Sequence, residues 1–432
     1  MSAIDSRLCV IGLCAALVAG CGGGATMGGG NSGGNGNNPA VVTLTFPSSV
    51  TLVAAQIGTG AFTMQALSTN KLSFSIPSGT SNYAIAYICP AQGTFQGQFT
   101  EEAVWEASVA DGTSVNLACM YNSVSTAGVG TLTGSLNAGA IPGVTALSVA
   151  AQGGNSLMIY GGSGGSAASL DIPAPIGSDR VLVLALGSAT QDPLAARNFN
   201  NQTVPGALNG GTTVVFGAAD ETASAAIAYN NVPSGFGSPS TYAGFQMAGS
   251  TFVVPLAAQA TTQYPVLPAT AMDSGDLYSL QAAASSTGNG SSSVFAGAAS
   301  LGGQVSLTFP APWTYSGPMA AAVPVFNFGY TGFSGKTGIL DEASYSWQSG
   351  TSGSTALIDG IELTATTNYQ GASTSLTAPN LSSLTGFLSA PASGGQVNWS
   401  AGIWQFSYGV EGAPTLSSTW AGVSNSGVFT TP

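Results

Sequence analysis

Apolar and polar residues alternate in short stretches along most of this chain, which is the pattern of β-strands with one buried face. These stretches are rich in β-branched and aromatic side chains and are bounded by Gly, Pro, Asn or Asp; clear examples are residues 41–46, 72–76, 181–184 and 305–309. We find no stretch with the periodicity of an amphipathic helix. We therefore predict an all-β protein of tandem antiparallel β-sandwiches, immunoglobulin-like or transthyretin-like.

A loose internal repeat divides the folded part of the chain. Its clearest marker is a strand-like segment that starts at a glycine and is expected to close each module, at residues 112–117, 211–216, 303–307 and 395–399. These glycines are 99, 92 and 92 residues apart, a period that suits one small β-sandwich per repeat. We predict four modules, at residues 39–125, 126–220, 221–312 and 313–432. Chance agreement of common Gly-Thr-Val patterns remains the alternative, because each match is short.

The N-terminal region has a different pattern. An apolar run of 13 residues, 8–20, is too short for a transmembrane helix, which needs about 20 residues. The run ends in Leu-Val-Ala-Gly-Cys at residues 17–21. This segment resembles the lipobox of bacterial lipoproteins, in which a signal peptidase cuts before the cysteine and the cysteine carries acyl chains such as palmitate.

The resemblance implies a signal peptide at residues 1–20, a lipidated Cys21, and attachment to a lipid bilayer. Gly22, rather than aspartate, follows the cysteine, which in lipoproteins implies export to the bacterial outer membrane; the leaflet stays open. Ordinary secretory cleavage at Ala19 or Gly20, without lipid, is the alternative.

Residues 22–38 are expected to form a flexible tether between the lipid and the folded region. The segment has 9 glycines in 17 residues and no charged side chain, so it cannot bury enough apolar surface to become ordered. A coil of this length has a root-mean-square reach of about 20 to 25 Å. Together with Cys21 it makes up the predicted region 21–38.

Two cysteines remain in the folded region, Cys89 and Cys119, and we predict that they form a disulfide in an oxidising compartment. Each ends a strand-like alternation that places it on the apolar face: residues 83–89 for one and 115–119 for the other.

Composition excludes several functions. The chain has 5 Lys or Arg, 17 Asp or Glu and no histidine, with a net charge of -12, so nucleic acid is not an expected partner. Without histidine a Ser-His-Asp or Cys-His arrangement cannot form, and no Gly-x-Ser-x-Gly motif occurs. We therefore predict a protein that is not an enzyme and that has no cofactor.

Paired carboxylates are the catalytic option that needs no histidine, and glycosidases use such a pair. The candidates lie in the last module and are Asp341, Glu342, Asp359, Glu362 and Glu411. The non-catalytic alternative is that these residues are solvated side chains of turns and strands. Calcium is a further alternative, with oxygen ligands from the turn Asp273–Asp276 or from the adjacent Asp341 and Glu342.

Tryptophan gives the best local indication of a binding surface. Five of the six tryptophans lie in residues 313–432, and Trp404, Phe406 and Tyr408 alternate onto one face of a predicted strand. If that face is exposed, it suits stacking against sugar rings or a protein partner. If it is buried, these residues are core.

Three classes of function fit these patterns. The first is a membrane-anchored protein, facing the surface or the periplasm, with a non-catalytic binding or adhesive role toward a glycan or an envelope protein. The second is a purely structural protein of the cell envelope. The third is a carboxylate-dependent carbohydrate-active enzyme.

Overall fold

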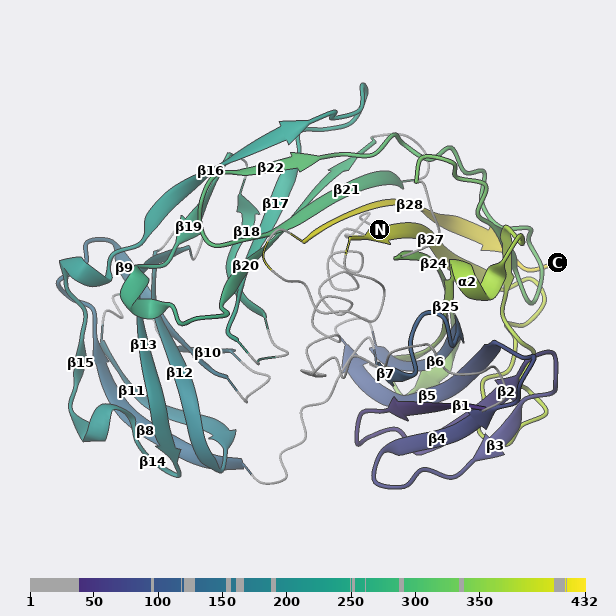
Figure 1. Ribbon diagram of the computed structural model, residues 1–432, viewed down its shortest axis with the longest axis horizontal. Coiled ribbons are helices and arrows are strands. Elements are labelled where there is room, and N and C mark those ends of the chain that lie inside the picture. Colours follow the sequence, from purple (N-terminus) through teal and green to yellow (C-terminus); the bar gives the residue numbers. More distant parts are fainter. Residues whose placement is uncertain are drawn as a thin grey trace.

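The computed structural model describes residues 39–94, 97–117, 119, 129–152, 157–160, 167–187, 192–248, 250, 253–260, 262–286, 291–333, 338–407, 416 and 418–432. The expected signal peptide, Cys21 and the tether lie outside these residues, as do Tyr408 and Glu411. The elements are almost all strands, packed as sandwiches, so the prediction of an all-β sandwich-type fold is confirmed (Figure 1). No helix among the described residues is long and apolar enough to cross a membrane.

The first sandwich packs one sheet, in the order β4-β1-β7, on part of a larger sheet. Its strands are β1 (Ala40–Thr45), β2 (Leu52–Ile57), β3 (Thr63–Gln65), β4 (Lys71–Ile76), β5 (Asn82–Thr94), β6 (Gly97–Ser108) and β7 (Ser114–Asn116). Alternation fills its core, because Tyr83, Ile85 and Tyr87 all point from β5 to the same side. Cys89 and Cys119 form a disulfide at the edge of this core, which confirms the predicted pair.

The second sandwich consists of two sheets, in the orders β10-β9-β12-β13 and β11-β8-β14, with β15 paired to β8. Its elements are β8 (Val129–Asn137), β9 (Val144–Ala151), β10 (Leu157–Tyr160), β11 (Ala167–Pro175), β12 (Gly177–Gly187), β13 (Pro193–Val204), β14 (Gly206–Ala207), η1 (Leu208–Gly211), β15 (Val214–Val215) and η2 (Ala218–Asp220). Strand β12 is apolar on both faces because it is buried on both. Val181 and Val183 face the core of this sandwich, whereas Leu182 and Leu184 face the neighbouring core.

The rest of the chain forms two further layers of strands over one continuous core. The elements of the third sandwich are β16 (Ala223–Asn230), β17 (Ser240–Gln246), β18 (Val253–Ala260), β19 (Gln263–Val266), η3 (Ala269–Ala271), β20 (Leu277–Ser285), β21 (Ser291–Ser300) and β22 (Val305–Thr308). Those that follow are β23 (Val325–Asn327), β24 (Ile339–Ser352), β25 (Thr355–Thr366), α2 (Thr367–Gln370), β26 (Ser375–Thr377), β27 (Gln396–Phe406) and β28 (Thr419–Thr430).

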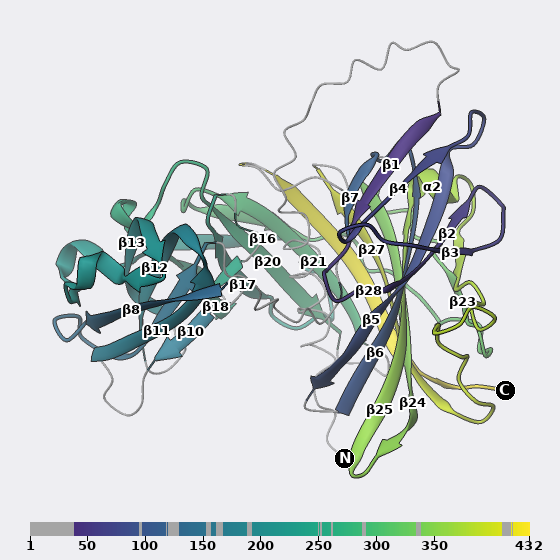
Figure 2. The same cartoon turned by 90° about the horizontal axis from the view of Figure 1, so that it is seen from below.

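A single twelve-stranded sheet joins the first, third and fourth predicted modules. Its strand order is β18-β17-β20-β21-β28-β27-β24-β25-β6-β5-β2-β3. Two pairings make the joins: β25 runs parallel to β6, and β21 runs antiparallel to β28. In Figure 1 this sheet forms an arch, with β16 and β22 along its convex side. The second sandwich forms a separate lobe at one end (Figure 2).

The repeat marker has two different structural meanings. In its first three occurrences it forms β7, β15 and β22, and each of these runs parallel to the first strand of its own sandwich. The fourth occurrence, at residues 395–399, instead starts β27, which lies inside the large sheet between β24 and β28. The interpretation of this last segment as a closing strand is therefore wrong. The predicted boundaries near 220 and 312 fall between β15 and β16 and between β22 and β23, and they stay predictions.

Candidate functional site

The central strands of the large sheet carry different side chains on their two faces. Along each strand, successive side chains point to opposite faces. The outer face carries Ala343 and Ile403, which belong to the core that β23 and β26 cover. The inner face carries Glu342, Glu362 and Trp404 on β24, β25 and β27. It lies on the concave side of the arch, because the core of the third and fourth modules lies on the other side (Figure 1).

Strand pairing arranges the inner face in rows, since directly paired residues point to the same side. The first row crosses β25, β24, β27 and β28 and consists of Glu362, Ser344, Ser400 and Ser426. The second consists of Trp105, Thr364, Glu342, Gly402 and Ser424. These two rows are called the polar part. The next two rows, called the aromatic part, contain Leu340, Trp404, Gly422 and Phe295, then Phe406, Trp420 and Gly297.

The aromatic part is flat because its rings lie over glycines. A Cβ added at Gly422 would come within 2.3 Å of the ring of Trp404, and one added at Gly297 within 1.9 Å of the ring of Trp420. Any side chain at these two positions would displace the indoles. Phe295 packs beside Trp404, with ring centroids 5.0 Å apart.

Of the two alternatives for this strand, the buried one holds for the residues that the structure describes, and the exposed aromatic platform is wrong for them. Trp404 is 2% exposed and Phe406 is 8% exposed, and both belong to one apolar cluster with Trp420. Both alternatives predict the same alternation along β27, so the sequence pattern could not separate them. Tyr408 lies outside the described residues.

Three glutamates form a chain of hydrogen-bonded carboxyl groups across β6, β25 and β24. The side chain of Glu362 is hydrogen-bonded to those of Glu101 and Glu342. Trp404 Nε1 donates to Glu342 Oε2 over 2.9 Å. A carboxylate has no proton to donate, so each carboxyl–carboxyl contact requires that one partner is protonated. Glu101 and Glu342 are buried, whereas Glu362, the middle member of the chain, is partly exposed.

The surroundings favour the neutral form of these acids. Burial, followed by the charge of Glu362, raises the pKa of Glu342 well above its usual value, although the Trp404 hydrogen bond opposes this. Burial also raises the pKa of Glu362, while its hydrogen bonds to Glu101 and Glu342 act in the opposite direction. Tyr87 lies close enough that the charges of Glu101 and Glu362 add to burial in raising its pKa well above 10.0.

The other predicted carboxylates do not join this group. Asp341 and Asp359 belong to the opposite face of β24 and β25, since they pair with Ile403 and Trp347. Burial raises the pKa of Asp341 to about 7, and a hydrogen bond from Gln370 opposes the shift. Because Asp341 and Glu342 point to opposite faces, the calcium site suggested for this pair is wrong. No group of three acidic or cysteine side chains within the described ranges is placed to hold a metal ion.

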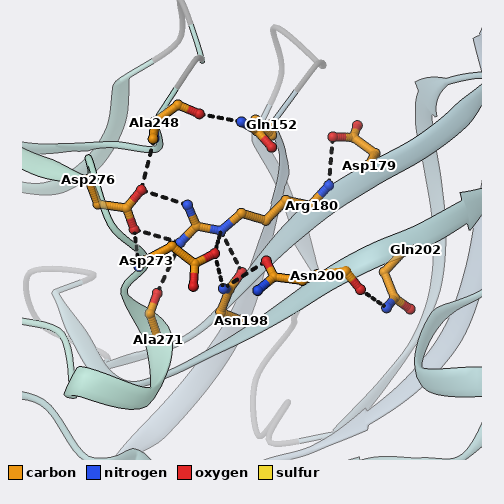
Figure 3. A network of polar contacts seen from close by, with 10 residues as sticks. All are labelled: Gln152, Asp179, Arg180, Asn198, Asn200, Gln202, Ala248, Ala271, Asp273 and Asp276. Atoms are coloured by element: carbon orange, nitrogen blue, oxygen red, sulfur yellow. Dashed lines mark hydrogen bonds and ion pairs between the residues drawn. The ribbon is translucent and has the colours of Figure 1, made fainter.

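The turn Asp273–Asp276, the other calcium candidate, is occupied by an arginine (Figure 3). Arg180 on β12 donates from both terminal nitrogens to the two carboxylate oxygens of Asp276, over 2.6 Å each. Arg180 Nε lies 3.2 Å from Asp273 Oδ2, and the backbone N–H groups of Ala248 and Asp273 donate to Asp276. This turn therefore ties the second sandwich to the third.

Sequence reasoning found Glu342, Glu362 and Trp404 but missed Glu101 and Trp105, which reach the same face from β6. Their contribution depends on the parallel pairing of β6 with β25, which no local pattern predicts. A usable signal exists for the ring–glycine contacts. In Gly402-Ile403-Trp404 and Trp420-Ala421-Gly422, a glycine and a tryptophan two residues apart share a face of one strand.

Comparisons with known proteins give no family. No family model matches this chain, and neither does any curated protein. Among solved structures, the Bacillus anthracis TIE protein matches over 56% of this chain and 45% of that chain, with 8% identical residues and a TM-score of 0.14. The chain thus spans less than half the length of that structure, and a likeness this weak carries no argument.

Proposed function

We propose that this chain is a lipid-anchored lipoprotein of the bacterial outer membrane whose folded region is a non-catalytic binding protein. The observation that carries the binding role is the inner face of the large sheet. Elsewhere the apolar clusters have members from two packed layers, but the described members of the aromatic part all come from the twelve-stranded sheet itself. Beside them lies the polar part, whose Glu362, Ser344 and Ser400 are partly exposed.

The geometry of the acids supports binding rather than hydrolysis. Glycosidases of the retaining kind hold their two carboxyl groups about 5 Å apart, and inverting ones hold them farther apart. Glu342 is instead 4% exposed, so only Glu362 of this pair is accessible to a sugar or to water. Glu342 Oε2 already accepts a hydrogen bond from the indole of Trp404.

Anchoring rests on the sequence around Cys21. The resemblance of residues 17–21 to a lipobox and the uncharged tether at 22–38 support attachment to a bilayer at the end of a flexible linker. Two or more acyl chains make such an attachment stable, whereas one chain binds only marginally.

The test is Cys21→Ala, with Cys14→Ala as the matched control inside the apolar run. We expect Cys21→Ala to lose fatty-acid labelling and to leave the membrane fraction, while Cys14→Ala keeps both properties. Circular dichroism of the released protein should still show β-structure. A Cys21→Ala protein that stays in the membrane fraction and still takes up labelled fatty acid would contradict the anchor.

A further inference from the structure

We propose that the polar part of the inner face binds a neutral glycan chain; this rests on the proposed binding role. In the complex, Glu362, Ser344 and Ser400 hydrogen-bond to sugar hydroxyls, and the half-exposed indole of Trp105 packs against a sugar ring. The chain of sugars runs across the strands, along the row that ends at Ser426.

The row is long enough for more than one sugar. Neighbouring strands lie about 4.8 Å apart, so the four strands from β25 to β28 span roughly 14 Å. Serines occupy three successive positions of the row, on β24, β27 and β28. The hydroxyls of Ser344 and Ser400 are 2.7 Å apart, which places them side by side on one surface. A glycan presents hydroxyl groups at comparable intervals along its length.

Unpartnered donors on this face point to a ligand with oxygen acceptors. One such donor is the indole N–H of Trp105, which lies in the second row of the polar part. It has no hydrogen-bond partner among the described residues. A buried donor without a partner is costly, so such groups indicate an acceptor that binds from outside the fold.

The charges of the face select a neutral ligand. Glu101, Glu342 and Glu362 are its ionisable groups along the polar part, and no Lys or Arg occurs in the described rows. The whole chain carries a net charge of -12. Phosphate, sulfate or uronate groups would therefore be repelled, whereas carboxyl and serine hydroxyl groups can each donate to or accept from sugar hydroxyls.

A protein partner fits this surface less well. Protein interfaces depend on a few large anchors, above all Trp, Tyr and Arg, that fill pockets at the centre. Here the accessible side chains are serines, one carboxyl group and a single partly exposed tryptophan, Trp105, while Trp404 and Trp420 are buried. Small hydroxyl groups on a flat sheet suit a ligand with many hydroxyls of its own.

The experiment uses the exported, mature protein on an array of neutral and anionic glycans, followed by calorimetry with any oligosaccharide that binds. Ser426→Phe places a ring in the row, and Glu362→Gln keeps the shape of the side chain but replaces its carboxyl group by an amide. Ser383→Phe, in an exposed loop beside the outer core, is the matched control. Thermal unfolding of each variant shows that it is folded.

We expect binding to neutral glycans, a loss of at least tenfold in affinity for Ser426→Phe, a several-fold loss for Glu362→Gln, and no change for Ser383→Phe. Binding to anionic glycans alone, or equal affinity in folded Ser426→Phe, overturns the inference. If a purified protein partner or a second copy of this chain binds in place of a glycan, and Ser426→Phe weakens that binding, the inference of a glycan ligand is overturned and the proposed binding role remains. If the inner face binds neither a glycan nor a protein, both the glycan inference and the proposed binding role are overturned.

Discussion

At the scale of single residues, glycine decides where the large side chains of the inner face lie. Gly422 and Gly297 let the indoles of Trp404 and Trp420 lie flat on neighbouring strands. Trp404 also donates to Glu342, so the ring is fixed both by packing and by a hydrogen bond. This residue is therefore a structural support for the carboxyl chain rather than an exposed contact.

Trp404→Ala should accordingly be strongly destabilising. Truncating a core tryptophan lowers the free energy of unfolding by about 3 to 5 kcal/mol, and the lost hydrogen bond to Glu342 adds to this. Val428→Ala is the control: Val428 is on the same face of neighbouring β28 but is 52% exposed, so its change should stay within about 0.5 kcal/mol. Urea unfolding measures both. Equal midpoints for the two variants would show that Trp404 is not core.

At the scale of elements, one ion pair fixes the second sandwich against the third. Arg180 is 6% exposed and Asp276 is 2% exposed, and the pair joins β12 to the turn before β20. Burial alone would raise the pKa of Asp276, but hydrogen bonds from Arg180, Asp273 and Ala248, with the arginine charge, together lower it below 3.8. The stabilisation is therefore present above the ordinary pKa of an aspartate and is lost as the pH falls below it.

Asp276→Asn should destabilise this junction. The variant keeps the size of the side chain but leaves the buried Arg180 with only the more exposed Asp273 as a counter-charge. Breaking a buried ion pair typically lowers stability by about 3 to 5 kcal/mol. Arg197→Gln is the control, because Arg197 forms an ion pair with Asp220 in the same sandwich and is 39% exposed; we expect less than about 1 kcal/mol there. Limited proteolysis should cut Asp276→Asn faster between the two sandwiches. Unchanged cutting and unfolding in Asp276→Asn would rule out this role.

Local pattern predicts the elements of this protein better than their assembly. Alternation predicted strands such as β5 and the inward position of Cys89, because a side chain's face depends only on its place in its own strand. The pairing of β6 with β25 joins residues more than 200 positions apart, and it depends on complementary faces that alternation does not specify. For the same reason the segment at 395–399 matched a closing strand in sequence but forms the start of a central one.

At the scale of the whole molecule, several of the acidic side chains are buried around the pairing of β6 with β25. Burial raises the pKa of Glu102 to about 7 and that of Glu106 to about 7, while hydrogen bonds from Leu388 to Glu102 and from Tyr369 to Glu106 oppose the shifts. Asp341 on neighbouring β24 is raised to about 7 for the same main reason. These groups lie on the outer face, opposite the three glutamates of the inner face. The first and fourth modules are thus joined through acids that favour the protonated state.

This arrangement makes stability depend on pH in a defined direction. A glutamate whose folded pKa is about 7 keeps its proton while the unfolded chain, near 4.5, has lost it. This contribution to stability is therefore full below about pH 4.5, falls as the pH rises toward about 7, and is constant above that. The total fall is roughly 3 kcal/mol for a shift of about two units in one buried group. Glu102→Gln, which removes one such titration, should flatten the slope between pH 4.5 and 7 in urea unfolding, whereas Glu221→Gln at an exposed position should leave it unchanged. A stability that rises with pH across this window, or a slope that is the same in Glu102→Gln, would mean that these acids are ionised in the folded protein.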